Sequence, residues 1–282
     1  MLDQFIEECS KKNSEATTRA YKYTLQQFEN WLGLSGKNLE NFESYDLQNY
    51  AFYLAGENKS ENTLRKVQFV IQKYCKWANK TECINAINFK VYAKKDNRIE
   101  LKIMNLHQVN YLLSSLNSSQ DKRDAAIVKT LLFTGIRLME LVSLNKNDIE
   151  VTEERRLLRV KMSKGHTNIR VIPLNTEVFA SLERYLEERN DNDPALFTSS
   201  RGERISARHI QHIVSKYGVS ALQLRRTFIN ELVRSNSLNY LDVRGIVGNM
   251  TGHGIIDPTF NYIQPSSSEN IVNKLDEFYK GI

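Results

Sequence analysis

Residues 134–141 read TGIRLMEL, and this stretch joins a helix break to two charged residues. Gly135 interrupts an apolar run with helical periodicity that extends from residue 121 to residue 143. Arg137 and Glu140 are three residues apart, so they lie on one face of the next helical turn. The pair has two interpretations. It is either a surface ion pair, or an arginine that a carboxylate holds so that its guanidinium group can donate hydrogen bonds to a phosphate.

The sequence on either side of this stretch predicts a mixed second half of the chain. Apolar residues at helical spacing predict helices over 105–117, 121–143, 176–190 and 206–217. Two short β-rich runs, LLRVKM (157–162) and IRVIPL (169–174), are joined by SKGHTN. This arrangement predicts a hairpin with Gly165 in its turn.

The first half of the chain predicts helices alone. Ser14 and Ser60 stand where helices would be capped, and an apolar stripe at helical spacing follows each of them. Residues 89–100 are rich in lysine and carry no apolar periodicity. We therefore expect a mainly α protein with a small β-sheet, in which a helical domain (1–88) and a linker (89–100) precede a mixed α/β domain (101–282).

Composition and charge narrow the class of protein. With 282 residues, 41% hydrophobic and 26% charged, the chain is typical of a folded globular protein and excludes collagen-like and wholly disordered classes. No long apolar run or signal peptide is visible, so we expect a cytoplasmic protein without a membrane span. The net charge is +6, and division at residue 98 gives 15 − 12 = +3 before and 24 − 21 = +3 after it. This balance permits binding to a polyanion.

Several kinds of chemistry lack their sequence motifs. No GxxxxGK[ST], GxGxxG or HExxH motif is present, so nothing predicts a nucleotide cofactor or a zinc protease site. Cys9, Cys75 and Cys83 form no CxxC pair and are expected to be buried or inert thiols. His209 and His212 are spaced so that they could share a metal, but no third ligand is evident, and a polar helix face is the alternative. We expect no metal and no cofactor.

Four segments follow the order of the motifs of one family, and a fifth, in the helical half of the chain, precedes them. TGIRLMEL resembles the TGxRxxEL box of the tyrosine recombinases, the phage integrase and Xer-like family. Residues 160–174 (VKMSKGHTNIRVIPL) resemble its GKGxKxRxVPL segment, and residues 222–232 (LQLRRTFINEL) resemble HxLRHTFATHL. Residues 251–263 (TGHGIIDPTFNYI) resemble LGHSSISTTQIY, and residues 17–32 (TTRAYKYTLQQFENWL) resemble the opening of the helical half.

The resemblance implies a set of site residues. Its catalytic positions fall on Arg137, Lys164, Arg225, His253 and Tyr262. Tyr262 would be the nucleophile that forms a covalent phosphotyrosyl intermediate, the two arginines would stabilise charge on the phosphate, and Lys164 would act as general acid. His253 would donate a hydrogen bond to a phosphate oxygen, and Glu140 would support an arginine. None of these roles needs ATP or a metal.

Four features depart from the family pattern, one of which is a spacing from Arg225 to His253 that is about five residues longer. Leu222 occupies the position where the family usually has a histidine, and leucine cannot transfer a proton. Gln223 is adjacent but lies about 100° around the helix, and Arg226 replaces a second common histidine. The hairpin segment is also about one residue longer than the family pattern, which leaves Lys161 as a weaker candidate for the lysine role.

The resemblance also implies partners and a fold. It implies a helical SAM-like core-binding domain and a mixed α/β catalytic domain that grip double-stranded DNA at specific recombination sites. It further implies cleavage and rejoining through a 3′-phosphotyrosyl intermediate and a Holliday junction, by a homotetramer in which the C-terminal helix (residues 266–279) docks into a neighbouring protomer. The alternative is that this helix packs on its own domain. Accessory proteins, nucleoid association and a bacterial, phage or transposon origin, such as a cointegrate resolvase, are consistent with it. The alternatives are a catalytically impaired DNA-binding relative and a type IB-like topoisomerase.

Overall fold

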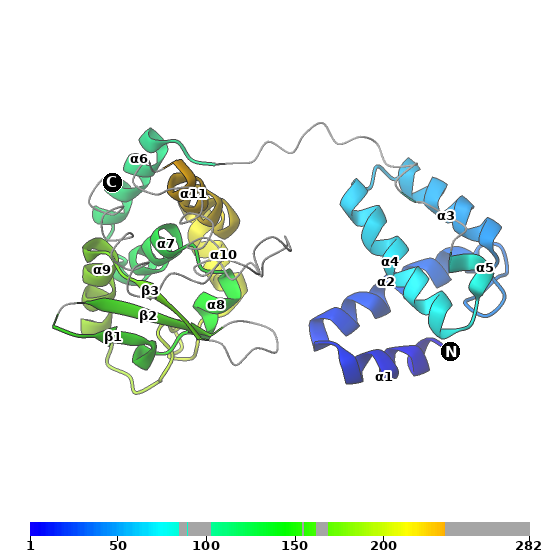
Figure 1. Cartoon of the computed structure of the whole chain (residues 1–282), viewed down its shortest axis with the longest axis horizontal. Coiled ribbons are helices and arrows are strands. Elements are labelled where there is room, and N and C mark those ends of the chain that lie inside the picture. The colour runs from blue at the N-terminus through cyan, green and yellow to red at the C-terminus, as the bar shows by residue number, and fades with distance from the viewer. Residues whose placement is uncertain (85–88, 90–102, 154, 162–168, 235–282) are drawn as a thin grey trace, which may run out of the picture. The chain divides into compact units, whose positions relative to one another are not determined.

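The structure, a computed structural model, describes residues 1–84, 89, 103–153, 155–161 and 169–234. The chain forms two compact units, Met1–Glu100 and Leu101–Ile282 (Figure 1). The described elements are mainly helices, with one small antiparallel sheet. The predicted fold class is therefore confirmed. No helix in the described ranges is long and apolar enough to cross a membrane.

The described part of the first unit is helical, as the sequence predicted. Its helices are α1 (Leu2–Lys12), α2 (Glu15–Gly33), α3 (Ser44–Gly56), α4 (Glu61–Trp77) and α5 (Thr81–Ile84). The Ser14 side chain accepts a hydrogen bond from the Thr17 backbone N–H, and Ser60 accepts one from that of Thr63. These two serines satisfy N–H groups that have no partner within a helix, so they fix where α2 and α4 begin.

Aromatic side chains fill the core of the first unit. Phe28 packs edge-on against Phe42 at a centroid distance of 5.1 Å, and the Tyr74 hydroxyl donates to the Leu39 carbonyl oxygen across 3.1 Å. The three cysteines are free and buried in this core, which confirms the expectation for them. Burial raises the pKa of each thiol, that of Cys75 to about 12, because the charged thiolate loses hydration.

Helices surround a central buried helix in the second unit. They are α6 (Leu106–Asn117), α7 (Lys122–Thr134), α8 (Leu138–Ser143), α9 (Thr176–Glu187), α10 (Ala207–Lys216) and α11 (Ala221–Arg234). Every residue of α7 from Asp124 to Thr134 is buried, and α7 packs against α6, α9, α10 and α11 (Figure 1). A helix buried on all sides requires such a surrounding layer, and α7 thereby fixes the positions of the helices that carry candidate residues.

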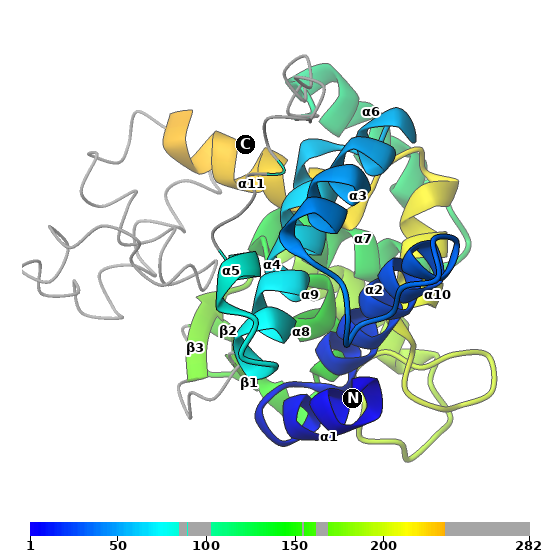
Figure 2. The ribbon, with the colours of Figure 1, turned by 90° about the vertical axis from the view of Figure 1, so that its right-hand side faces the viewer.

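The sheet of this unit has the order β1-β2-β3, with β1 (Ile149–Val151), β2 (Arg156–Lys161) and β3 (Ile169–Pro173). The predicted hairpin of β2 and β3 is present, and its register pairs Val160 with Arg170 and Lys161 with Ile169. In Figures 1 and 2 the strands lie together beside α8, which contacts β2. Strand β1 was not predicted, because three residues are too few to show an alternating pattern.

Gly135 ends α7 and separates it from α8, so the region predicted as one interrupted helix is two helices. Its φ of 60° lies in the left-handed region, which glycine adopts without the steric cost that a Cβ imposes. A Cβ at this position would also collide with the ring of Phe228 on α11. The glycine therefore permits both the sharp turn after α7 and the close approach of α11.

Candidate active site

Arg137 occupies the N-cap position of α8 and is held by Glu140 in two ways. The Arg137 backbone N–H donates to Glu140 Oε2 across 2.6 Å, and Arg137 Nη1 donates to Glu140 Oε1 across 3.2 Å. The Arg137 side chain is 36% exposed, whereas the Glu140 side chain is fully buried. The pair is therefore not a surface ion pair. It is a partly accessible arginine anchored by a buried carboxylate.

Glu140 also binds a second arginine, Arg170 on β3. Arg170 Nη1 donates to Oε1 across 2.9 Å, and Arg170 Nη2 donates to Oε2 across 2.6 Å. Burial alone would raise the pKa of Glu140, but hydrogen bonds from Arg170 and from the Arg137 backbone N–H outweigh burial and lower it. Glu140 thus carries its negative charge at neutral pH while out of contact with solvent.

Arg225 of α11 joins this group from another part of the chain. Its Nη1 donates to the Gly135 carbonyl oxygen, at the break between α7 and α8. The pKa of Arg225 is lowered to about 10, first because the side chain is buried and next because Arg137 is a nearby positive charge. Arg170 lowers it further, and Glu140 opposes the shift. Arg225 stays protonated at neutral pH, so it adds a positive charge to the cluster.

The charge balance of the cluster defines what it can bind. Arg137, Arg170 and Arg225 contribute three positive charges and Glu140 one negative charge, a net of 3 − 1 = +2 for these four side chains. Guanidinium groups held by fixed partners present their N–H donors in a constant geometry, which suits the paired oxygens of carboxylate and phosphate. The arrangement can therefore bind an anion and stabilise negative charge that develops on it.

The two lysine candidates fall differently in the structure. Lys161, at the end of β2, is exposed on the face of the sheet opposite to Arg170, since side chains alternate along a strand and Val160, the partner of Arg170, faces the core. Lys161 therefore does not point toward Glu140 or Arg170. Lys164, the preferred candidate, lies outside the described residues.

Two further predicted site residues, His253 and Tyr262, also lie outside the described residues, as does the predicted C-terminal helix (266–279). Of the predicted site residues, those that the structure describes and brings together are Arg137, Glu140 and Arg225.

The family's histidine position is occupied by an exposed side chain. Leu222 lies at the start of α11, one turn before Arg225, and is 55% exposed. Gln223 lies about 100° further around the helix, where it lines a cavity of about 350 Å³ with residues of α6, among them Gln108 and Tyr111. Arg226 is partly buried. In the structure, the position one turn before Arg225 therefore offers no group that can exchange a proton.

Arg170 is the member of the cluster that sequence reasoning missed. The apolar letters of IRVIP suggest that Ile169 and Val171 face the core, yet both are exposed and Arg170 and Ile172 are buried. The signal was present in β2, where Arg159 and Lys161 alternate with the buried Leu158 and Val160. The register of the hairpin then places Arg170 beside Val160 on the core face.

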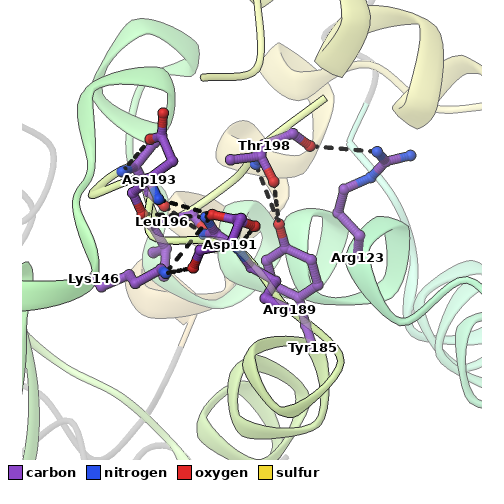
Figure 3. A network of polar contacts seen from close by, with 9 residues as sticks. Arg123, Lys146, Tyr185, Arg189, Asp191, Asp193, Leu196 and Thr198 are labelled. Carbon is purple, nitrogen blue, oxygen red and sulfur yellow. Dashed lines mark hydrogen bonds and ion pairs between the residues drawn. The ribbon is translucent and has the colours of Figure 1, made fainter. Parts of the chain in front are cut away.

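The polar network around Arg189, at the end of α9, is separate from this cluster (Figure 3). Arg189 Nε donates to Asp191 across 2.9 Å, and its Nη atoms donate to the carbonyl oxygens of Asp193 and Leu196. The Tyr185 hydroxyl accepts a hydrogen bond from the Thr198 backbone N–H. These contacts hold residues 191–198 against α9, which is a structural role.

The alternative metal site gains no further ligand in the described residues. His209 and His212 lie on α10 and line a shallow surface hollow with Arg208, Gln211 and Ser215. Across the described ranges, no group of three or more His, Cys, Asp or Glu side chains is arranged to hold a metal ion.

Comparison with known proteins places these residues in a family. Residues 102–269 match the phage integrase family, and residues 2–82 match the phage integrase N-terminal SAM-like domain. Tyrosine recombinase XerC of Corynebacterium glutamicum is 28% identical over 283 residues, covering 95% of this chain and 88% of that protein. XerC of Staphylococcus aureus is 27% identical, covering 91% of this chain and 88% of that protein.

Solved structures with the same fold include the Tn1549 transposon integrase bound to transposon right end DNA. The TM-score is 0.72 and the identity 16%, and 98% of each chain is covered. A second is the XerH site-specific recombinase in a post-cleavage complex with a palindromic difH substrate. Its TM-score is 0.67 and its identity 18%, with 94% of this chain and 77% of that chain covered.

Proposed function

This chain belongs to the phage integrase family and is a tyrosine recombinase, and on that premise we propose that Arg137 and Arg225 bind the phosphate at which duplex DNA is cut. The activity of the family is site-specific recombination, the cleavage and rejoining of DNA. The observation that carries the proposal is the convergence of two arginines from separate segments, one anchored on Glu140 and the other on Gly135.

The chemistry is a transfer of one phosphodiester bond. The Tyr262 oxygen attacks the phosphorus, a 3′-phosphotyrosyl bond forms, and the bond to the 5′ oxygen breaks. Lys164 supplies the proton that the leaving 5′ oxygen takes up, and His253 donates a hydrogen bond to a non-bridging oxygen. The Tyr262 hydroxyl releases its proton to another group or to water, since Leu222 cannot accept it. A 5′ hydroxyl of a second DNA strand then reverses these steps and restores a phosphodiester.

The two arginines act on the transition state. Negative charge accumulates on the non-bridging oxygens as the phosphorus becomes five-coordinate, and donors already fixed in place stabilise it without reorganisation. Arg137 is the N-cap residue of α8, and Glu140 accepts a hydrogen bond from its backbone N–H. Its guanidinium group is accessible to solvent. Arg225 supplies a largely buried one, whose interaction with an anion is screened little by solvent.

The substrate is double-stranded DNA with specific sites, and the active assembly is a homotetramer on two such sites. The Tn1549 integrase and XerH neighbours are complexes with DNA, which supports this substrate. The exposed Lys66 and Lys76 on α4 give the first unit, the helical core-binding domain, cations for phosphate contacts. We also propose accessory proteins and association with the nucleoid, because both are consistent with membership of this family.

The experiment uses a pool of duplexes with random sequence around one nick at a fixed position, so that cleavage close to the nick releases a short fragment and traps the enzyme on DNA. We expect the wild-type chain to form a covalent adduct that survives denaturing electrophoresis, and sequencing of the trapped DNA then identifies the site. On a duplex recovered in this way, Arg225→Lys should slow cleavage ~100-fold, as for loss of one fixed oxyanion donor, with little change in DNA affinity. Equal cleavage by wild type and variant would contradict the assignment of Arg225.

Leu222 favours a second candidate, a catalytically impaired relative that binds DNA without cutting it, because the side chain one turn before Arg225 has no proton to exchange. That protein would bind duplexes in a salt-dependent manner and form no adduct with any of them. A type IB-like topoisomerase would instead form the adduct and relax a supercoiled plasmid without a second site.

A further inference from the structure

Arg170 lies at a buried position, where a charged side chain must have a partner of opposite charge. It is 7% exposed and occupies a core position of β3, opposite Val160 and two residues before the buried Ile172. An unpaired charge at such a position is strongly unfavourable, so the guanidinium group depends on a carboxylate. Glu140 is that carboxylate, and it accepts two parallel hydrogen bonds from Arg170.

The hydrogen bonds to Glu140 link Arg170 to Arg137. Each carboxylate oxygen of Glu140 accepts one hydrogen bond from Arg170 and one from Arg137. A carboxylate has about four lone-pair sites, so these four bonds use its whole capacity. The two bonds from Arg170 fix the plane of the carboxylate, and that plane sets where the N–H and the guanidinium group of Arg137 can lie.

We propose that Arg170 is a positioning residue for DNA cleavage, which acts through Glu140 to hold Arg137 in the geometry that binds the phosphate. This inference rests on the proposed function and assigns a role to a residue that acts through another side chain. This role of Arg170 also connects the β2–β3 hairpin to the site. Residues 161 and 169 form the last described pair before residues 162–168, so Arg170 anchors the strand end from which the segment with Lys164 departs.

A purely structural ion pair is the competing interpretation, and pH separates the two. With Arg170 present, the pKa of Glu140 lies below its ordinary value of 4.5. Loss of Arg170 removes the largest effect that lowers the pKa of Glu140 while burial still raises it, so the pKa of Glu140 should rise in the variant. The variant should therefore cleave slowly at low pH, where Glu140 is neutral and releases Arg137, and faster as the pH rises and Glu140 ionises. Wild type should lack this dependence on Glu140.

The experiment compares R170M and R170K with wild type in single-turnover cleavage of the nicked duplex recovered from the random pool. R170M should lose ~100-fold in the cleavage rate constant at neutral pH, comparable to loss of an aligned donor, while its Kd for the duplex changes less than about twofold. R170K keeps the charge but not the bidentate geometry, so its rate should lie between those of R170M and wild type. The double variant E140Q/R170M should lose the dependence on pH.

Arg189→Met is the matched control. Arg189 is also a buried arginine paired with a carboxylate, but its bonds go to Asp191 and to carbonyl oxygens of residues 193–196. Its loss should lower stability and leave the cleavage rate of the folded protein unchanged. If R170M behaves like R189M, with normal cleavage and no new dependence on pH, Arg170 is only structural and the inference is wrong.

A second measurement does not need cleavage. The side-chain Nε–H resonance of Arg137, assigned by comparison with R137K, should shift in R170M and R170K but not in R189M. An unmoved resonance would overturn the positioning role even if cleavage were slow. Conversely, absence of any adduct with wild type would contradict the proposed function, whereas the resonance would still decide whether Arg170 positions Arg137. If R170M does not fold, R170K carries both measurements.

Discussion

At the scale of single residues, the candidate centre depends on which charges are buried and what holds them. Glu140 is buried and ionised because two arginines donate to it, and Arg225 is buried beside positive charge. The sequence predicted Arg137, Glu140 and Arg225 because they belong to segments that resemble motifs of the family. It could not predict that Glu140 is fully buried, since an Arg and a Glu three residues apart have the same spacing on a surface helix.

Leu222 yields a prediction at this scale. Because it is exposed and one turn before Arg225, Leu222→His should fold normally and add a group that exchanges protons at neutral pH. We expect cleavage of the recovered duplex to accelerate ~10-fold or more, somewhat below the usual range of general acid–base effects. Leu222→Gln is the control, because glutamine can donate a hydrogen bond but cannot transfer a proton. Equal rates in both variants and wild type would show that another group, or water, already suffices.

At the scale of elements, the site depends on the break between α7 and α8 and on one strand. Gly135 turns the chain after α7, offers its carbonyl oxygen to Arg225 and leaves room for Phe228. The break itself was predictable from a glycine in a helical run. The contact of Gly135 with α11 was not predictable, because Phe228 and Arg225 are far from Gly135 in the sequence. The burial of Arg170 could be predicted only with the register of the hairpin, because the residue types of β3 alone suggest that Ile169 and Val171 face the core.

Gly135→Ala tests this element. A left-handed φ costs a residue with a Cβ ~1 kcal/mol or more, and the collision with Phe228 adds to it, so we expect the free energy of unfolding of the second unit to fall by more than ~2 kcal/mol. Gly218→Ala is the matched control. Gly218 has a φ of 71°, but no atom lies within 4 Å of the place that a Cβ would take, so this variant should lose only ~1 kcal/mol.

Denaturant unfolding followed by circular dichroism measures both glycine variants. The two tryptophans, Trp31 and Trp77, belong to the first unit, so their fluorescence reports that unit by itself and should not change. Equal losses in the two variants would mean that Phe228 yields without cost and that the close approach of α11 is not what requires glycine.

At the scale of the whole molecule, two units share the basic charge and only part of the candidate centre falls in the described residues. Met1–Glu100 carries 15 − 13 = +2 and Leu101–Ile282 carries 24 − 20 = +4, which suits a protein that contacts DNA phosphates with both units. The helices of the first unit, and the mixture of helices with a β-hairpin in the second, followed from periodicity. The family followed from the order of its motifs, and matches to both its catalytic and its SAM-like domains confirm it.

The most direct test of the account asks which residue becomes joined to DNA. The nicked-duplex adduct is digested with protease, and the peptide that retains nucleotide is identified by mass spectrometry. We expect the peptide with Tyr262, and complete loss of the adduct in Tyr262→Phe while DNA binding is retained. An adduct on another residue, or one that persists in Tyr262→Phe, would contradict it.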